Sequence, residues 1–371
     1  MNKSNIHICH LTSAHPDGDV RIFHKQCVSL AKFGYKVSLI IPNTLSRIEK
    51  GVNIISFNCD YNTKRERMTI AVNRVFEEAI KLNADIYQLH DPELLKISKK
   101  LKKRGKKVIY DVHEDLPRQI MSKHWIPKYL RKIISITAEY YENKIAYQLN
   151  GIITATPFIK NRFKKINQNT IDINNFPILN ELFIEQKYYE KEENNICYVG
   201  GITKNRGVFE LVSSLHNISV KLLLAGSFLE NDIRTELVKK STWKQVVELG
   251  FLNREEVKEV YKKSKIGMVT LHPIVNYIDS LPVKMFEYMA AGIPVIASNF
   301  TSWKTIIEKH NCGICIDPLN VSEISNALEK LLNNPDLAAE MGKNGQNLVL
   351  KNYNWEIEEK KLLAFYKTII E

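Results

Sequence analysis

Two charged side chains, Lys284 and Glu287, stand among apolar residues in the stretch SLPVKMFEYMAAGIPVIAS, residues 280–298. Because they are three residues apart, they are neighbours on the surface of a helix. A solvated ion pair is the plain interpretation. However, a cation in the first turn opposes the helix dipole unless a phosphate binds there, and a carboxylate one turn later can accept hydrogen bonds from a ribose. The pattern therefore predicts a nucleotide site, with Lys284 toward phosphate and Glu287 toward ribose.

A second candidate site is the turn YVGGITKNRG at residues 198–207. A strand, two glycines, basic residues and then a helix form an arrangement that can cradle a phosphate. An ordinary tight turn explains the glycines equally well. The stretch matches neither the dinucleotide-binding G-x-G-x-x-G nor the P-loop, so hydride transfer and Walker-type ATP hydrolysis are not indicated.

The elements that must position these residues are strands alternating with helices, which predict a parallel, doubly wound sheet. One series of strands runs through the first half of the chain, and a second begins near residue 195. We therefore expect two Rossmann-like α/β domains, covering 1–178 and 190–354, that face each other across a cleft. The last helix, 355–371, is expected to pack back on the first domain. Ligands of such sheets bind at the carboxyl ends of the strands.

The composition, 44% hydrophobic and 25% charged over 371 residues, is that of a folded chain with large cores. There is no run of about 18 apolar residues and no signal peptide at the start, so we expect a cytoplasmic protein. Cys312 and Cys315 have the C-x-x-C spacing, but a zinc site needs a second pair of ligands that is not visible. These cysteines are interpreted as structural.

The net charge of +12 lies entirely in the first half of the chain. Residues 1–180 hold 30 Lys and Arg against 16 Asp and Glu, a net charge of +14, whereas residues 181–371 hold 23 against 25. Two basic runs stand out, 99–107 and 118–136, and the second interleaves its charges with apolar and aromatic residues. That pattern favours peripheral binding to the inner face of an anionic membrane. Nucleic-acid binding is not favoured, because its sequence motifs are absent.

The chain resembles a known enzyme family in several segments. VGGITKNRG, GFLNREEVKEVYKKSKIGMV and SLPVKMFEYMAAGIPVIAS are similar, in that order and spacing, to the donor-binding domain of family 4 retaining glycosyltransferases, which have the GT-B fold and use nucleotide sugars. HLTSAHPDGDVRIFHKQCVSLAKFGYKVSLI, ADIYQLHDPELL and KKVIYDVHEDLP are similar to the acceptor domain of that family. The resemblance covers essentially the whole chain.

The resemblance implies a set of donor-binding residues, all in the second half except for Gly18 and Asp19 in the loop after the first strand. Glu287 matches the glutamate that holds the ribose hydroxyls, and Asp279 takes the place of an earlier glutamate near the sugar. Arg206 matches the basic residue on the diphosphate, while Lys284 or Lys204 supplies the charge of a missing arginine. The remaining donor contacts that the resemblance implies are Gly18, Asp19, Gly200, Gly201, Phe251, Leu252, Ser280, Leu281, Pro282 and Val283.

The resemblance also implies an active-site histidine, His113, near the transferred sugar. A loop hydrogen bond is the alternative role for this residue, and also for His90. Together with Glu114 these histidines are candidates for binding the acceptor. Asp91 and Glu93 are interpreted as helix caps. The DGD at 17–19 mimics a metal-binding motif of a different fold, but neither a metal nor a cofactor is expected.

The function implied is transfer of a sugar from a nucleotide donor, expected to be a UDP-sugar, to a glycan or lipid-linked acceptor in surface polysaccharide assembly. Retention requires the acceptor to attack from the face that the nucleotide leaves, with His113, Arg206, Lys284 and Asp279 as the catalytic candidates. A nucleotide-sugar epimerase of the same architecture is the rival enzyme. A non-catalytic nucleotide-sugar-binding protein is the rival from another class.

Overall fold

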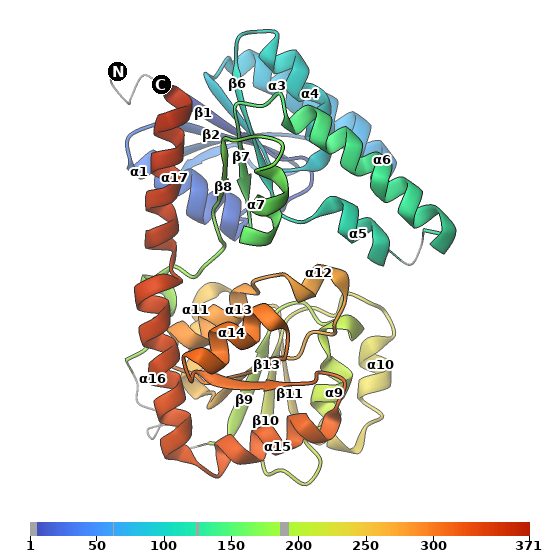
Figure 1. The fold of residues 1–371 in the computed structure, drawn as a ribbon, viewed down its shortest axis with the longest axis vertical. Coiled ribbons are helices and arrows are strands. Elements are labelled where there is room, and N and C mark those ends of the chain that lie inside the picture. Colours follow the sequence, from blue (N-terminus) through green and yellow to red (C-terminus); the bar gives the residue numbers. More distant parts are fainter. Residues whose placement is uncertain (1–5, 62, 124–125, 186–192) are drawn as a thin grey trace. The chain divides into compact units, whose positions relative to one another are not determined.

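The structure is a computed structural model that describes residues 6–61, 63–123, 126–185 and 193–371. The chain divides into two compact units, Met1–Asn175 together with Glu358–Glu371, and Phe176–Ile357 (Figure 1). Each unit is built on one sheet whose strands alternate with helices along the chain. The prediction of two doubly wound α/β domains is therefore confirmed, whereas the expected cleft between them stays a prediction.

The sheet of the first unit has its strands in the order β3-β4-β2-β1-β5-β6-β7-β8. All neighbours are parallel except β3 and β4. The order reverses between β1 and β5, and ligands of open α/β sheets bind beside the carboxyl ends of such a pair. The strands are β1 (His7–Leu11), β2 (Lys36–Pro42), β3 (Arg47–Glu49), β4 (Val52–Phe57), β5 (Ile86–Leu89), β6 (Lys107–Val112), β7 (Gly151–Thr154) and β8 (Thr170–Asp172).

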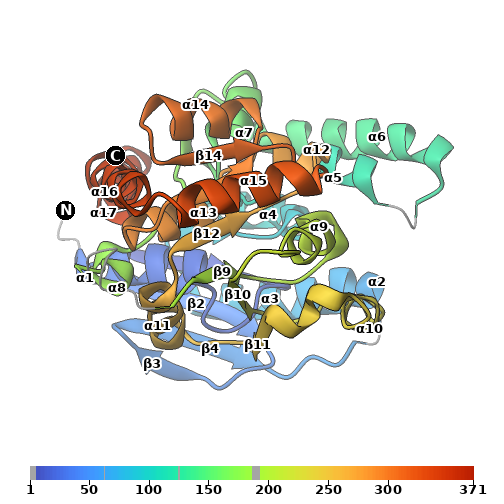
Figure 2. The ribbon, with the colours of Figure 1, turned by 90° about the horizontal axis from the view of Figure 1, so that it is seen from below.

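Helices cover both faces of this sheet (Figure 2). Their buried residues recur with helical spacing, as in α3, where Val72, Val75 and Ala79 face the core. The helical segments are η2 (Val20–Cys27), α1 (Val28–Lys32), α2 (Lys64–Glu66), η3 (Arg67–Ala71), α3 (Val72–Leu82), η4 (Pro92–Leu94), α4 (Leu95–Lys102), α5 (Leu116–Ser122), α6 (Lys128–Ala146) and α7 (Pro157–Phe163).

The last helix, α17 (Trp355–Ile370), contacts β6 and β7 of the first unit. Lys107 donates hydrogen bonds from Nζ to the carbonyl oxygens of Ile369 and Ile370 at the end of this helix. A Cβ atom at Gly151 would lie 2.5 Å from the Phe365 ring, so β7 begins with a residue that has no side chain. Most of α17 thus belongs to the first unit although it follows the second in sequence.

The sheet of the second unit is entirely parallel, in the order β11-β10-β9-β12-β13-β14. Its order reverses between β9 and β12. The strands are β9 (Asn195–Val199), β10 (Lys221–Ala225), β11 (Val246–Gly250), β12 (Ile266–Val269), β13 (Val295–Ser298) and β14 (Gly313–Ile316). The helices are α8 (Leu179–Leu182), η6 (Lys204–Arg206), α9 (Val208–Ser213), α10 (Ile233–Leu237), η7 (Ser241–Gln245), α11 (Arg254–Lys263), α12 (Val275–Ile278), α13 (Val283–Ala290), α14 (Thr301–Lys309), α15 (Val321–Leu332) and α16 (Pro335–Asn352).

Helix α13 lies in the core of the second unit, and all its residues from Met285 to Ala290 are buried. It packs against α16, where a Cβ atom at Gly342 would lie 2.2 Å from the carbonyl oxygen of Gly292. The glycine therefore permits the close approach of the turn that leads from α13 to β13. The helix predicted within 280–298 is confirmed, and it leads into the buried strand β13.

The elements that sequence patterns did not predict are short ones, such as β3, β8, α10 and α12. Segments of three to five residues contain too few positions to show a helical or strand period. Among the described residues, no helix is long and apolar enough to cross a membrane.

Candidate functional site

The glycine turn of the second unit lies at the carboxyl end of β9, where the strand order reverses. Gly200 has a φ of +130°, which residues with a side chain rarely adopt. A Cβ atom there would lie 3.1 Å from Nζ of Lys284 and 3.6 Å from Nη1 of Arg206. The fold thus brings together the glycines and two of the cations that the sequence predicted for a diphosphate.

Lys284 has an unusual environment for a lysine amine. Its Nζ atom is buried and has no hydrogen-bond partner among the described residues. It lies 3.6 Å from the centre of the Tyr198 ring, a cation–π contact. Burial and then the neighbouring Arg206 charge lower the pKa of Lys284 well below its usual value. A lysine held in this way is ready to pair with an anion.

Arg206 is held at the turn by its neighbours. Nη1 donates to the carbonyl oxygen of Gly201 at 3.0 Å, and the hydroxyl of Tyr198 donates to the same oxygen at 2.9 Å. The hydroxyl of Tyr277 is a further partner of the guanidinium. Tyr198 and Tyr277 were missed by sequence reasoning, because a tyrosine in a strand or short helix usually signals packing alone. Lys204, in contrast, is exposed.

Glu287 is buried, 6% exposed, and its hydrogen-bond partners are Arg254 and Tyr261, not Lys284. Oε1 accepts a hydrogen bond from Arg254 Nη1 at 2.8 Å, and Oε2 accepts one from the Tyr261 hydroxyl at 3.0 Å. Both partners come from α11. Lys284 is instead directed toward the Tyr198 ring, so the interpretation of Lys284 and Glu287 as a solvated ion pair is wrong. Sequence reasoning missed Arg254, whose link to Glu287 spans 33 residues.

The start of α13 differs in detail from the sequence prediction. Pro282, not Ser280, is the residue that precedes the first helical turn. Serine is a common helix cap, but the Ser280 hydroxyl donates to the carbonyl oxygen of Tyr277 and does not cap α13. Asp279 ends the preceding short helix, α12. Leu281, Pro282 and Val283 are half-buried, as is Leu252, whereas Phe251 is 82% exposed.

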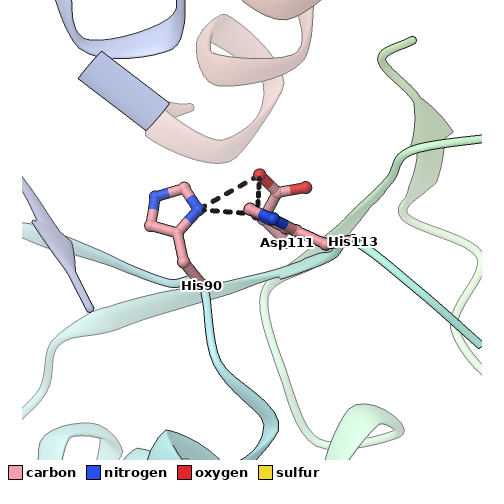
Figure 3. A group of neighbouring side chains, drawn as sticks. All are labelled: His90, Asp111 and His113. Carbon is pink, nitrogen blue, oxygen red and sulfur yellow. Dashed lines mark hydrogen bonds and ion pairs between the residues drawn. The ribbon is translucent and has the colours of Figure 1, made fainter. Parts of the chain in front are cut away.

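A second constellation lies in the first unit, also where the strand order reverses. His90 follows β5, and Asp111 and His113 lie at the end of β6. Figure 3 shows the two imidazole rings and the carboxylate directed toward one another. Nδ1 of His90 and Nε2 of His113 are 3.2 Å apart, and each is 3.2 Å from Oδ2 of Asp111. The fold thus unites the two histidines that the sequence singled out.

Asp111 was not predicted, yet it is the centre of this constellation and is fully buried. Its carboxylate receives two hydrogen bonds from Arg21, at 2.6 and 3.1 Å, and one from Gln26 at 2.7 Å. Although burial raises the pKa of Asp111, the charges of Arg21 and His113 lower it well below its usual value. Burial lowers the pKa of His90 to about 4. His90 is therefore a neutral imidazole at physiological pH.

The three side chains His90, Asp111 and His113 are also close enough to hold a metal ion. The Arg21 guanidinium, which binds both oxygens of the same carboxylate, opposes a second cation there. Hydrogen bonds among His90, Asp111 and His113 account for the short distances between them. In the DGD motif, Asp17 binds Arg47 and Thr44.

The loop after β1 brings a further histidine to this constellation. His15 lies against His113, with ring centres 4.6 Å apart, and its Nδ1 is 3.2 Å from Oδ2 of Asp19. Asp19 caps η2, because its side chain also accepts a hydrogen bond from the backbone N–H of Ile22 in the first turn, and Gly18 has a φ of +73°. Burial lowers the pKa of His15, but the carboxylates of Asp19 and Asp91 raise it by more.

Two predicted helix caps are wrong. Asp91 makes no cap for η4; its Oδ2 accepts from the Thr12 hydroxyl at 2.9 Å and from the Ser13 backbone N–H at 2.6 Å. Glu93 pairs with Arg67 at 2.6 Å. Glu93 also accepts a hydrogen bond from the Ser13 hydroxyl at 3.2 Å, so both carboxylates contact the loop after β1 from positions distant in sequence. Glu114 is exposed and accepts from the Gln119 amide.

Two protein-family models match the chain, one on each half. The model described as Glycosyltransferase Family 4 matches residues 16–173. The model described as Glycosyl transferases group 1 matches residues 180–348. Together they cover both units, including the glycine turn, α13 and the histidine constellation.

Curated relatives are similar at low identity. An uncharacterized glycosyltransferase, MJ1607 of Methanocaldococcus jannaschii, is 26% identical over 49% of this chain and 47% of its own. The capsular polysaccharide biosynthesis glycosyltransferase CapM of Staphylococcus aureus is 25% identical over 51% of this chain and 50% of its own. The matches thus span about half the length of these two relatives. An uncharacterized glycosyltransferase of Haemophilus influenzae is 24% identical over 97% of this chain and 99% of its own.

Solved structures share the fold over nearly the whole chain. Sucrose-phosphate synthase from Thermosynechococcus elongatus has a TM-score of 0.81 at 16% identity, covering 98% of this chain and 99% of that one. The Anabaena protein HepE, in complex with UDP-glucose, has a TM-score of 0.74 at 13% identity and covers 98% of this chain and 100% of that one. At such identities the likeness shows the fold.

Proposed function

Because the chain belongs to the family 4 glycosyltransferases and has the GT-B fold, we propose that it moves a sugar from a nucleoside diphosphate to an acceptor hydroxyl. The observation that carries the proposal is the buried Nζ of Lys284, which lies beside the glycine turn without a hydrogen-bond partner among the described residues. A donor diphosphate is the anion that would give this amine a partner. Arg206, at the same turn, supplies a second positive charge.

The donor would be oriented by groups in the first two turns of α13. The first-turn N–H groups and Lys284 face the diphosphate in this proposal, since a helix N-terminus favours negative charge. Glu287, already fixed by Arg254 and Tyr261, would accept hydrogen bonds from the ribose hydroxyls with its remaining lone pairs. Asp279 and the segment Ser280–Val283 would contact the sugar or the phosphates.

The chemistry we propose is retaining transfer. The bond between the anomeric carbon and the β-phosphate oxygen breaks, and the nucleoside diphosphate leaves with the electron pair. The acceptor oxygen bonds to the anomeric carbon on that same face, and its proton passes to the departing phosphate. Catalysis then rests on stabilising the leaving charge, which Arg206 and Lys284 provide in a site largely removed from water. This chemistry requires neither a metal nor a cofactor.

His113 would act in the first unit, near the transferred sugar. Because its Nε2 is engaged by Asp111 and His90, the opposite ring nitrogen, Nδ1, is the one we propose for a sugar hydroxyl. His90 is fully buried, so it is better suited to fixing the His113 ring than to touching an acceptor. These placements modify the expectation that both histidines bind the acceptor.

We propose UDP-sugars as donors and a polysaccharide or lipid-linked glycan as acceptor. Support comes from the neighbour HepE, which was solved with UDP-glucose, and from the relative CapM, named for capsular polysaccharide biosynthesis. The +14 charge of residues 1–180 supports peripheral association with the inner face of an anionic cell membrane, where lipid-linked acceptors would be met.

The test is incubation of the purified protein with single UDP-sugars, followed by NMR of the sugar. We expect slow release of UDP and an α-configured hydrolysis product from an α-linked donor. Arg206→Ala should abolish release, whereas Lys304→Met, an exposed lysine of α14, should leave it unchanged. Conversion of the intact donor into another nucleotide sugar would indicate an epimerase instead. Binding without any turnover, with or without glycan acceptors, would indicate a binding protein.

A further inference from the structure

Helix α6 carries a surface that the fold does not use. From Lys128 to Thr137 the side chain of Ser135 is the only buried one, and its hydroxyl donates to the Pro117 carbonyl of α5. The C-terminal half is anchored differently, because Glu142 is fully buried and accepts a hydrogen bond from Tyr110 of β6. Figure 1 shows the N-terminal half of α6 extending past the strands of the first unit, with α5 beside it.

The exposed side of α6 is apolar and aromatic. Tyr129 is 77% exposed, Ile133 61%, Ile136 56% and Tyr140 67%, and their spacing of four, three and four residues places them on one face. The exposed residues Leu130, Ile134 and Tyr141 widen this face. Single exposed apolar residues are ordinary, but a contiguous apolar face of this kind marks a site of interaction with a partner or a membrane.

Beside the N-terminal part of this face the charge is positive, whereas Glu139 stands next to Tyr140 at its C-terminal end. Residues 116–137, which include α5 and the first half of α6, contain five Lys and Arg and no Asp or Glu. Lys128 and Lys132 are exposed and lie one turn apart beside the apolar face. An apolar stripe with tyrosines, bordered by cations, is the arrangement that lets a helix lie in the interface of an anionic bilayer.

We infer that α5 and α6 form a docking element for an anionic lipid bilayer, with the Tyr129, Ile133, Ile136 and Tyr140 face entering the headgroup region. A second copy of this chain fits less well, because a symmetric contact would bring the same five cations against one another. Nucleic acid fits less well, because exposed isoleucines offer nothing to a phosphate backbone. The inference deepens the proposed membrane association and does not depend on the donor chemistry.

The experiment is sedimentation of the full chain with vesicles of equal parts phosphatidylglycerol and phosphatidylcholine, compared with phosphatidylcholine alone. We expect binding to the anionic vesicles that weakens as salt is raised. Ile133→Glu with Ile136→Glu should abolish this binding. Lys128→Glu with Lys132→Glu should weaken it at least about tenfold, since each cation near such a surface contributes roughly a fivefold change.

Matched controls separate this face from general effects of charge and apolar exposure. Ile48→Glu changes an isoleucine on β3 that is even more exposed than Ile133, and Lys99→Glu with Lys103→Glu reverses two exposed lysines of the other basic run. Both controls should bind as the wild type does. Thermal unfolding and UDP binding, measured in parallel without vesicles, should be unchanged in every variant. Thermal unfolding is the check on the first unit, which carries all these substitutions.

Three results would overturn the inference. The wild type fails to bind anionic vesicles, or the α6 variants bind as well as the wild type, or the controls lose binding to the same extent. A wild-type dimer in solution that Ile133→Glu with Ile136→Glu dissociates would assign the face to a second copy instead. Loss of UDP binding by all forms, with vesicle binding intact, would refute the proposed transfer but leave the docking element standing.

Discussion

Replacing Lys284 with methionine should weaken nucleotide binding without weakening the fold. The amine has no hydrogen-bond partner among the described residues, and a buried unsatisfied group of this kind costs about 1–3 kcal/mol. The contact with the Tyr198 ring returns up to about 2 kcal/mol when it is desolvated. Methionine keeps the length and removes the charge. Subtracting the second term from the first, we expect the free energy of unfolding to fall by no more than about 1 kcal/mol and to rise by up to about 3 kcal/mol.

The free energy of unfolding should also depend on pH differently in the wild type and in Lys284→Met. Burial and the Arg206 charge lower the pKa of Lys284 in the folded protein well below 10.5. Between that lowered pKa and 10.5, the unfolded chain binds a proton on this lysine that the folded chain does not. Stability of the wild type should therefore rise with pH across this window relative to Lys284→Met. The difference between the two proteins isolates this lysine from every other titrating group.

A bound diphosphate should instead favour the protonated form of Lys284, so the substitution should weaken UDP binding. A hydrogen bond from a charged donor is worth about 1.5–3 kcal/mol, so Lys284→Met should raise the dissociation constant for UDP by about 10- to 150-fold. A bound anion also favours the protonated amine, so binding to the wild type should take up a proton within the same pH window. Calorimetry in buffers of different ionisation enthalpy detects this uptake.

Urea unfolding and calorimetry of the same two proteins complete the test, with Lys304→Met as the control. Lys304 lies on α14, its side chain is 54% exposed, and its partner is Glu308 at 3.7 Å. It should change neither stability nor affinity appreciably. The reasoning is refuted if Lys284→Met binds UDP as tightly as the wild type. It is also refuted if this variant loses more than about 1 kcal/mol of stability, because the amine would then be a structural group.

Three further substitutions test the two constellations. Glu287→Gln should abolish the preference for UDP over 2′,3′-dideoxy-UDP, measured by calorimetry; an unchanged preference would place the ribose elsewhere. Asp111→Asn should cost about 3–5 kcal/mol of stability in urea unfolding at neutral pH. Since the pKa of Asp111 is lowered in the folded protein, the difference in stability between the wild type and Asp111→Asn should persist down to about pH 4 and disappear only below it. A difference that disappears near neutral pH would contradict the role of Asp111 as a buried, charged carboxylate. Gly226→Ala should weaken UDP binding, because its Cβ would lie 2.0 Å from the Gly200 carbonyl oxygen; Gly250→Ala, which has a positive φ but open space, should not.

Much of the second unit could be predicted because its signals are local. The apolar period of 280–298 and the Gly-Gly turn each lie within about 20 residues, and together they located Lys284, Arg206 and Glu287. The partners of these residues could not be predicted in the same way. The Glu287 carboxylate meets Arg254 and Tyr261 only after α11 and α13 pack together, and nothing in the spacing of the three residues reveals that contact.

The first unit shows the same division between local and distant signals. His90 and His113 were found because each follows an apolar strand run. Asp111 was missed because it lies inside such a run, and only the approach of Arg21, 90 residues earlier, reveals its role. The predicted cap at Asp91 failed for a similar reason, because the Thr12 hydroxyl and the Ser13 N–H compete successfully for its oxygens.

The account rests on a nucleoside diphosphate site at the glycine turn of the second unit. Calorimetric titration of the protein with uridine, UMP and UDP measures the contribution of each phosphate directly. We expect affinity to rise with each phosphate, most at the second, and this increment to disappear in Arg206→Ala and Lys284→Met. Equal affinities for uridine and UDP, or an increment for UDP that survives both substitutions, would contradict the account.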